Sequence, residues 1–202
     1  MNHEPKTLRS QDARTARLAE IHAPHIAPLT RFVEELRQQK GEDFHIPLMD
    51  PFDGGINAKV LFLLEAPGAK AKSSGFISRD NPDPTAANIW TMSRDVGIER
   101  TNCLLWNSVA WYVGTATRIR AVKAAEVRES ADALRTLLGL LAELRCVALV
   151  GRKAQLAIAT IKQARPDLPI VEMPHPSNQN LSTRPHYRPL VLEGFRQVAR
   201  LI

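Results

Sequence analysis

Four short apolar runs punctuate the central and C-terminal parts of the chain. They cover residues 59–64, 102–106, 146–150 and 169–173. Each run is almost continuously apolar over about five residues, which is typical of parallel strands that are covered on both faces. We therefore expect these runs to pair into one buried, mainly parallel, four-stranded sheet.

Apolar residues at helical spacing fill the intervals between these runs. Leu134, Leu137, Leu138 and Leu141, for example, fall on one face of a helix predicted over 126–144. Further helices are expected over 8–21, 29–39, 85–96, 153–164 and 189–201. Strands that alternate with helices predict an α/β fold, here a three-layer α/β/α arrangement with right-handed crossovers. We divide the chain into an N-terminal helical extension (1–45) and one α/β domain (46–202).

Composition narrows the class of protein. The chain has 202 residues, 44% of them hydrophobic, which is enough for a buried core and excludes a disordered tail. No apolar run approaches the ~18–20 residues of a membrane span, and the N-terminus has no signal-peptide core, so we expect a cytoplasmic protein without a membrane partner. The two cysteines, Cys103 and Cys146, are too few for a disulfide framework or a four-cysteine metal site. The net charge of +6 is compatible with a polyanionic partner.

The candidate functional residues come directly after the predicted strands in the sequence. Ligands of open α/β sheets bind beyond the carboxyl ends of the strands. The first run is followed by Glu65, Ala66 and the tight turn Pro67-Gly68, a turn that can direct backbone N–H groups such as that of Gly68 toward a ligand. An ordinary turn with a solvated glutamate is the plainer interpretation of the same residues.

Two further strand ends carry polar side chains. Asn107 follows the second run, where its amide reads a base edge in two directions or simply caps a turn. His175 follows the fourth run between two prolines that favour an extended backbone, so its imidazole has a stiff mount or merely packs. Four short polar residues come after it: Ser177, Asn178, Gln179 and Asn180.

Phe76 lies in a polar, glycine-containing stretch, where an aromatic ring either stacks on a flat ligand or folds back into the core. Lysines and arginines, Lys70 among them, fall in or beside the same segments and modestly favour a polyanion. An unrelated α/β hydrolase would need a nucleophile paired with a base. No such pair is evident, because Ser177 follows His175 by two residues on a proline-stiffened segment.

Taken together and in this order, the motifs resemble those of the uracil-DNA glycosylase superfamily over about residues 59–181. The matching segments are Leu64-Glu65-Ala66-Pro67-Gly68, Phe76, Asn107 and His175-Pro176-Ser177. The resemblance implies a DNA repair enzyme that flips uracil, and in some cases other deaminated bases, out of the helix and hydrolyses its N-glycosidic bond. It implies no metal or other cofactor, uracil-containing DNA as the partner, and a monomer.

The resemblance also implies a role for each residue. Phe76 would stack on the base, Asn107 would bind its imide edge, and the turn Ala66-Pro67-Gly68 would contact it through backbone N–H groups. His175 would stabilise the departing base anion, and either Glu65 or backbone groups would position the water. The DNA-binding residues would be Ser177, Asn178, Gln179, Asn180 and Lys70.

Two departures from the best-known branch of the family stand out. Ala66 occupies the position of its water-positioning aspartate, and Gln179 occupies that of its leucine wedge. The Glu-Ala-Pro-Gly form resembles an iron–sulfur branch, but the chain lacks the cysteines for a cluster. The alternative function is therefore a relative that binds or traps uracil-containing DNA with little turnover.

Overall fold

The computed structural model of the chain describes residues 4–115, 120–184 and 186–202. Its main sheet contains four strands, all parallel, in the order β4-β2-β5-β6. Each predicted apolar run forms one of them, and the predicted α/β class is confirmed. The strands are β2 (Val60–Leu64), β4 (Cys103–Asn107), β5 (Cys146–Val150) and β6 (Ile170–Met173).

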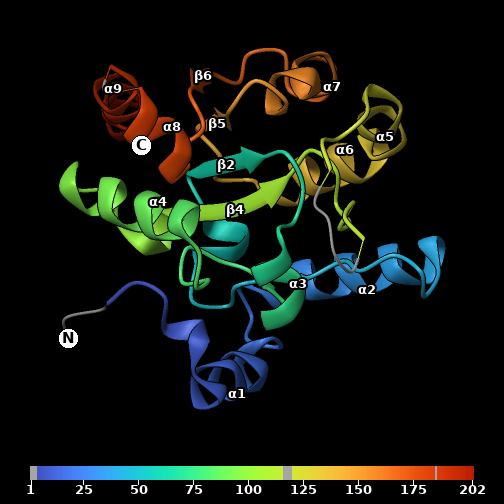
Figure 1. Cartoon of the computed structure of the whole chain (residues 1–202). Helices are drawn as coiled ribbons and strands as arrows, with labels where there is room; N and C mark the ends of the chain where they lie inside the picture. The colour runs from blue at the N-terminus through green and yellow to red at the C-terminus, as the bar shows by residue number, and fades with distance from the viewer. Residues whose placement is uncertain (1–3, 116–119, 185) are drawn as a thin grey trace.

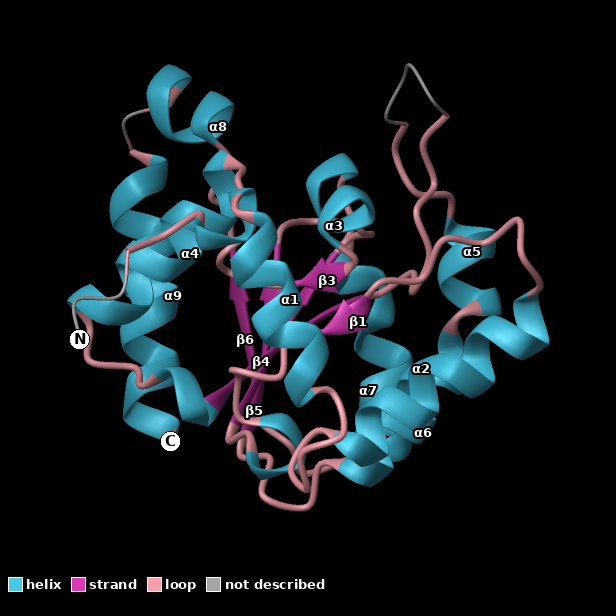
Figure 2. Ribbon diagram, turned by 90° about the horizontal axis from the view of Figure 1, so that it is seen from below, coloured by secondary structure: helices cyan, strands magenta, loops and turns pink. Residues whose placement is uncertain are grey.

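Helices cover both faces of this sheet, which gives the predicted three layers (Figures 1 and 2). Helices α4 (Pro84–Asp95) and α9 (Tyr187–Leu201) lie on one side, and α2 (Ala27–Lys40), α6 (Ala131–Leu140) and α7 (Ile158–Ala164) lie on the other. The remaining helices are α1 (Gln11–Glu20), α3 (Ala69–Ser74), α5 (Ala124–Glu129) and α8 (Asn178–Thr183). Short 3-10 turns cover Thr7–Arg9, Gly55–Asn57, Arg100–Asn102 and Ala154–Ala157.

Aromatic rings fix the helices to the sheet. Phe62 of β2 stacks on Phe195 of α9 with ring centroids 5.3 Å apart, and Trp106 of β4 meets Phe32 of α2 at 5.9 Å. Because α2 packs its apolar side into the same core, part of the segment 1–45 is buried with the sheet. The division of the chain at residue 45 stays a prediction.

Three of the predicted helices are interrupted. The one predicted over 8–21 begins with the 3-10 turn 7–9, and α1 starts only at Gln11. The segment predicted as one helix over 126–144 breaks at Ser130 into α5 and α6. The Ser130 side chain is buried and its Oγ accepts a hydrogen bond from the Ala110 backbone N–H, so a contact distant in sequence fixes the break. Likewise, the segment predicted over 153–164 begins with the 3-10 turn 154–157 before α7.

Two very short strands escape prediction altogether. Strand β1 (Leu48–Met49) pairs in parallel with β3 (Phe76–Ile77) beside the main sheet. Strands of two residues carry no period that a sequence pattern can reveal. They matter because each leads directly into buried charged residues.

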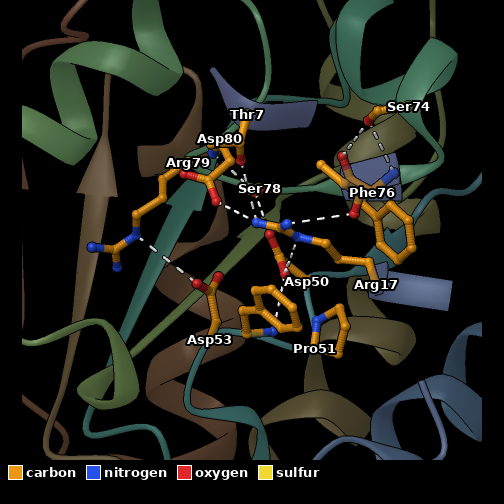
Figure 3. A network of polar contacts seen from close by, with 12 residues as sticks. Thr7, Arg17, Asp50, Pro51, Asp53, Ser74, Phe76, Ser78, Arg79 and Asp80 are labelled. Carbon is orange, nitrogen blue, oxygen red and sulfur yellow. Dashed lines mark hydrogen bonds and ion pairs between the residues drawn. The ribbon is translucent and has the colours of Figure 1, made fainter. Parts of the chain in front are cut away.

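These charged residues, together with Arg100, form what we call the ion cluster: Arg17, Asp50, Asp53, Asp80 and Arg100. Figure 3 labels Arg17 and the three aspartates. Arg100 binds Asp50, Asp53 and Asp80 at 2.8, 2.9 and 2.6 Å, and Arg17 of α1 binds Asp80 at 2.5 Å. Burial raises the pKa of the Asp53 carboxyl to about 7, against the opposing effect of Arg100. The cluster thereby joins α1 to the segments that follow β1 and β3.

The carboxyl ends of the parallel strands point toward α3 and α8 (Figure 2). Helix α3 follows β2, and α8 follows β6, so both are placed by the strand that precedes them. Across the described ranges, none of the helices has the length and apolar character needed to cross a membrane. The candidate residues are found at this end of the sheet.

Candidate active site at the carboxyl ends of the strands

A cavity of about 640 Å³ opens at this end of the sheet. Three of the predicted side chains, Glu65, Asn107 and His175, line it together although they come from three different strand ends. The predicted turn residues Ala66, Pro67 and Gly68 and the exposed Lys70 also line it. We call this space the base cavity.

Asn107 is the last residue of β4, where the register places it beside Leu64 at the end of β2. Its side chain is only 3% exposed, and its Nδ2 is buried without a hydrogen-bond partner among the described residues. A buried amide donor without a partner costs about 1–3 kcal/mol. An unpaired donor on a cavity wall is therefore suited to a ligand that supplies a carbonyl oxygen.

Glu65 directly follows β2 and is half-buried. Its Oε1 accepts a hydrogen bond of 2.7 Å from the backbone N–H of Val122. Its own backbone carbonyl accepts from the Val109 N–H at 3.0 Å, which fixes the turn to the end of β4. The carboxylate is thus held in place through one oxygen at the edge of the cavity.

The backbone around His175 is held in place by hydrogen bonds as well as by the two flanking prolines. The Asn180 Nδ2 donates to the His175 carbonyl at 3.0 Å, and the Asn88 Nδ2 of α4 donates to the Pro176 carbonyl at 2.8 Å. Gly151 packs directly against the imidazole. A Cβ at Gly151 would lie 3.0 Å from the His175 Cβ, and the φ of +90° at Gly151 also favours glycine.

The protonation state of His175 follows from its surroundings. Burial lowers the pKa of the imidazole, while the carboxylates of Glu65 and Asp83 act in the opposite direction. The net shift is downward from 6.5. The imidazole is therefore neutral at neutral pH and carries one N–H that can donate to a ligand.

Asp83 lines the same cavity and was not identified from the sequence. It is the N-cap of α4, and its Oδ1 accepts from the Ala86 N–H at 2.9 Å. Burial raises the pKa of this carboxyl, while hydrogen bonds from the helix N-terminus lower it. The signal was present, since an aspartate before Pro84 and a helical pattern is a typical N-cap. The helix expected over 85–96 starts one residue later than α4 and so leaves out this cap.

Phe76 is not where the sequence reasoning placed it. The sequence pattern indicated a polar, glycine-containing loop, but Phe76 lies in β3, is 1% exposed and belongs to the core. It is not among the residues that line the base cavity. Its neighbours Ile77, Ser78 and Asn81 are. The plainer interpretation, an aromatic ring that folds back into the core, describes this placement.

The residues after His175 form a helix rather than a loop. Ser177 caps α8, its Oγ accepting from the Asn180 N–H. Ser177, Asn178 and Gln179 line neither the base cavity nor the smaller cavity beside it, whereas Asn180 lines the smaller one. A serine followed by polar residues is a recognisable N-cap, so this short helix could have been predicted.

No three His, Cys, Asp or Glu side chains gather as a metal site within the part of the chain that is described. Cys103 and Cys146 are buried on opposite sides of Val60 in the sheet. The groups that line the cavity include the amides of Asn107 and Asn81, the neutral imidazole, two carboxylates and the cations of Lys70 and Arg120. Such a set suits recognition of a planar polar ligand together with acid–base or electrostatic catalysis.

The fold and the cavity define a doubly covered parallel α/β protein with its site at the carboxyl ends of the strands. A family model described as the Uracil DNA glycosylase superfamily matches residues 51–196. The chain belongs to this superfamily, and the resemblance inferred from the sequence motifs is confirmed. A search of curated proteins found no match.

Proposed function

We propose that the protein is a DNA glycosylase that hydrolyses the N-glycosidic bond of uracil in an extruded nucleotide and leaves an abasic site. The observation that carries the proposal is the buried Asn107 Nδ2, which has no partner among the described residues and belongs to a side chain that lines a cavity with His175. Membership of the superfamily supports the reaction class. The cytoplasmic location and the monomeric state expected from the sequence remain predictions.

Recognition of the base would rest on Asn107. Its amide oxygen would accept from the uracil N3–H, and its unpaired Nδ2 would donate to the neighbouring carbonyl. Cytosine presents the opposite pattern at these two positions and would leave both groups unpaired. Sites built on such hydrogen bonds discriminate by ~10⁴–10⁵ against a ligand that lacks them.

Bond cleavage would place negative charge on the departing base. The bond from the sugar C1′ to N1 breaks with its electron pair on the base, and the sugar becomes oxocarbenium-like. The neutral His175 imidazole would donate to the base oxygen that carries this charge, together with the backbone N–H groups of Ala66 and Gly68. One preorganised donor of this kind contributes about 2.7–4 kcal/mol to transition-state stabilisation.

The water that completes the reaction would be held by Glu65. Ala66 has no side chain that can do so, whereas Glu65 reaches the cavity and is fixed by Val122 through only one of its oxygens. The other oxygen would accept a proton as the water oxygen bonds to C1′. The base anion then takes a proton from solvent.

Contacts with the DNA would come from Lys70 at the rim and from the segment Ser177 to Asn180. A stacking role for Phe76 would require its ring to leave the core position. The variant Phe76→Leu keeps an apolar side chain there. It should leave uracil release within about twofold if Phe76 is a core residue, and lower it strongly if the ring stacks on the base.

The test is cleavage of an end-labelled oligonucleotide that contains one uracil, followed by alkali to break abasic sites. Matched oligonucleotides carry hypoxanthine or only normal bases, in single- and double-stranded form. Strand breakage at uracil supports the proposal. A complex with uracil-containing DNA that survives denaturation, without breakage, would indicate the alternative, a trapping relative. Neither breakage nor uracil-dependent binding would overturn both.

A further inference from the structure

A second cavity of about 430 Å³ adjoins the base cavity. Glu65 and His175 line both cavities, so these two side chains form a shared wall. On its far side the second cavity is bounded by the turn after β5 and by the segment that leads from α8 into α9. The roles proposed above use none of these outer residues except Asn180.

The outer wall of this second cavity is predominantly basic. Arg152, Lys153 and Arg184 line it, against the carboxylates of Glu65 and Glu172. Lys153 is anchored, since its Nζ donates to the Val122 carbonyl at 3.3 Å. That carbonyl belongs to the residue whose N–H holds Glu65. The backbone of Val122 therefore links the Lys153 ammonium group to the proposed catalytic carboxylate of Glu65.

An aromatic ring accompanies the cations. Tyr187, the first residue of α9, lines the second cavity. Its hydroxyl accepts from the Arg184 Nη1 at 2.8 Å, and the Arg184 guanidinium lies 5.0 Å from the centroid of its ring. A cation fixed next to an aromatic surface is the combination with which proteins bind single-stranded nucleic acid.

We propose that this second cavity binds the nucleotide that neighbours the target on the same strand, with its phosphate on the cations and its base against Tyr187. The proposal rests on the proposed function, because it takes the base cavity to hold the extruded base. The shared wall of Glu65 and His175 places the two spaces next to each other, as consecutive nucleotides require. A neighbour that stays stacked in a duplex cannot enter this cavity, so the subsite favours single-stranded DNA.

The experiment measures binding without turnover. Fluorescence anisotropy follows a labelled single-stranded oligothymidine that contains no uracil, over a series of salt concentrations. Tyr187→Ala should weaken binding about tenfold through loss of stacking. Arg184→Gln should weaken it and lower the slope of log K against log salt by about 0.7, because one phosphate contact is lost.

Matched variants separate the subsite from general effects. Arg188→Gln removes an exposed cation that follows Tyr187 in α9 and does not line the second cavity. This variant should therefore change binding by less than twofold. Tyr187→Phe keeps the ring and should restore most of the affinity lost in Tyr187→Ala. Circular dichroism of each variant checks that α9 is intact. Equal losses in Arg184→Gln and Arg188→Gln would overturn the proposal, as would equal losses with duplex DNA.

Failure of this inference can be told from failure of the proposed function. If the wild type releases uracil and Tyr187→Ala binds single strands as the wild type does, the proposed subsite is wrong and the proposed glycosylase activity is supported. If the subsite variants lose binding while the wild type releases no uracil, the subsite stands and the glycosylase is wrong. Oligonucleotides in which uracil is the first or the last nucleotide add a direct check, because each lacks one of the two neighbours. Only one of these two oligonucleotides should bind with lower affinity.

Discussion

The molecule buries polar groups in two places, and they differ in how those groups are partnered. In the ion cluster, each carboxylate lies within ion-pair distance of a guanidinium, and Arg100 alone contacts three aspartates. In the base cavity, the Asn107 Nδ2 is buried and has no partner among the described residues. The first region sets its charges against one another, although the Asp53 Oδ2 also lacks a hydrogen-bond partner among the described residues. The second region leaves an unpaired donor facing an open space.

This difference shows that buried polarity alone does not mark a functional site. The ion cluster contains more charge than the base cavity, but its groups hold α1 and the segments after β1 and β3 together. The cavity has fewer charges, and its groups converge on a space large enough for a ligand. The comparison predicts that changes in the cluster alter stability and that changes in the cavity alter activity.

The largest expected effect is on stability, from Arg100→Ala. Removing this guanidinium leaves buried carboxylates without their main counter-charge, which costs about 3–5 kcal/mol. Denaturant unfolding should show the loss. Arg94→Ala is the control, because Arg94 forms an exposed ion pair with Asp95 that contributes only about 0–1 kcal/mol. Similar losses in both variants would show that the cluster adds no particular stability.

The next effect is on catalysis, from His175→Ala. The loss of a preorganised donor should lower single-turnover release of uracil by ~10²–10³. Affinity for uracil-containing DNA and the midpoint of thermal unfolding should change little. The His175 carbonyl, not its imidazole, accepts the hydrogen bond from Asn180 that holds the loop. Parallel losses of binding and release would show that the imidazole holds the loop or the DNA rather than the leaving base.

A smaller effect is expected from Asn88→Ala, because Asn88 positions the loop that carries His175. Its Nδ2 donates to the Pro176 carbonyl and, at 3.2 Å, to the Asn178 Oδ1. We expect kcat to fall about tenfold with little change in KM, since misplacement of a catalytic group acts on the chemical step. Asn178→Ala removes only the longer contact and should leave kcat near that of the wild type. A rise in KM alone would contradict a positioning role.

The smallest effect is a shift in pH dependence. Because burial lowers the pKa of His175, the imidazole stays neutral as the pH falls to 6.5, and release should decline only below that value. Asp83→Asn keeps a good N-cap for α4 but removes a carboxylate that raises the pKa of His175. The acid limb of the rate profile should therefore move to lower pH in this variant. A limb that moves to higher pH, or not at all, would contradict the electrostatic effect of Asp83 on His175.

The sheet and the three converging side chains could be predicted from the sequence for a physical reason. Continuous apolar runs identify buried parallel strands, and parallel strands bring their carboxyl ends to one edge, so Glu65, Asn107 and His175 had to lie close together. Their roles came from the family resemblance. Local signals for Asp83 and for the cap of α8 were also present and were read incorrectly or missed.

The remaining features depend on contacts that no local pattern shows. Phe76 enters the core because a two-residue strand pairs with β1, and Ser130 breaks a helix because it bonds Ala110. The pairing of Arg17 with Asp80 joins residues 63 positions apart. Such contacts are set by the assembled fold and become visible only in three dimensions.

The central claim is that the unpaired Asn107 amide recognises an extruded uracil for hydrolysis. The most direct test is single-turnover release of uracil from a single-stranded oligonucleotide by the wild type and by Asn107→Ala, with thermal unfolding measured in parallel. The account predicts release by the wild type and a loss of ~10²–10³ in the variant. It also predicts that the variant is at least as stable, because a buried donor without a partner among the described residues is removed. Equal release by both proteins, or no release by the wild type, would contradict it.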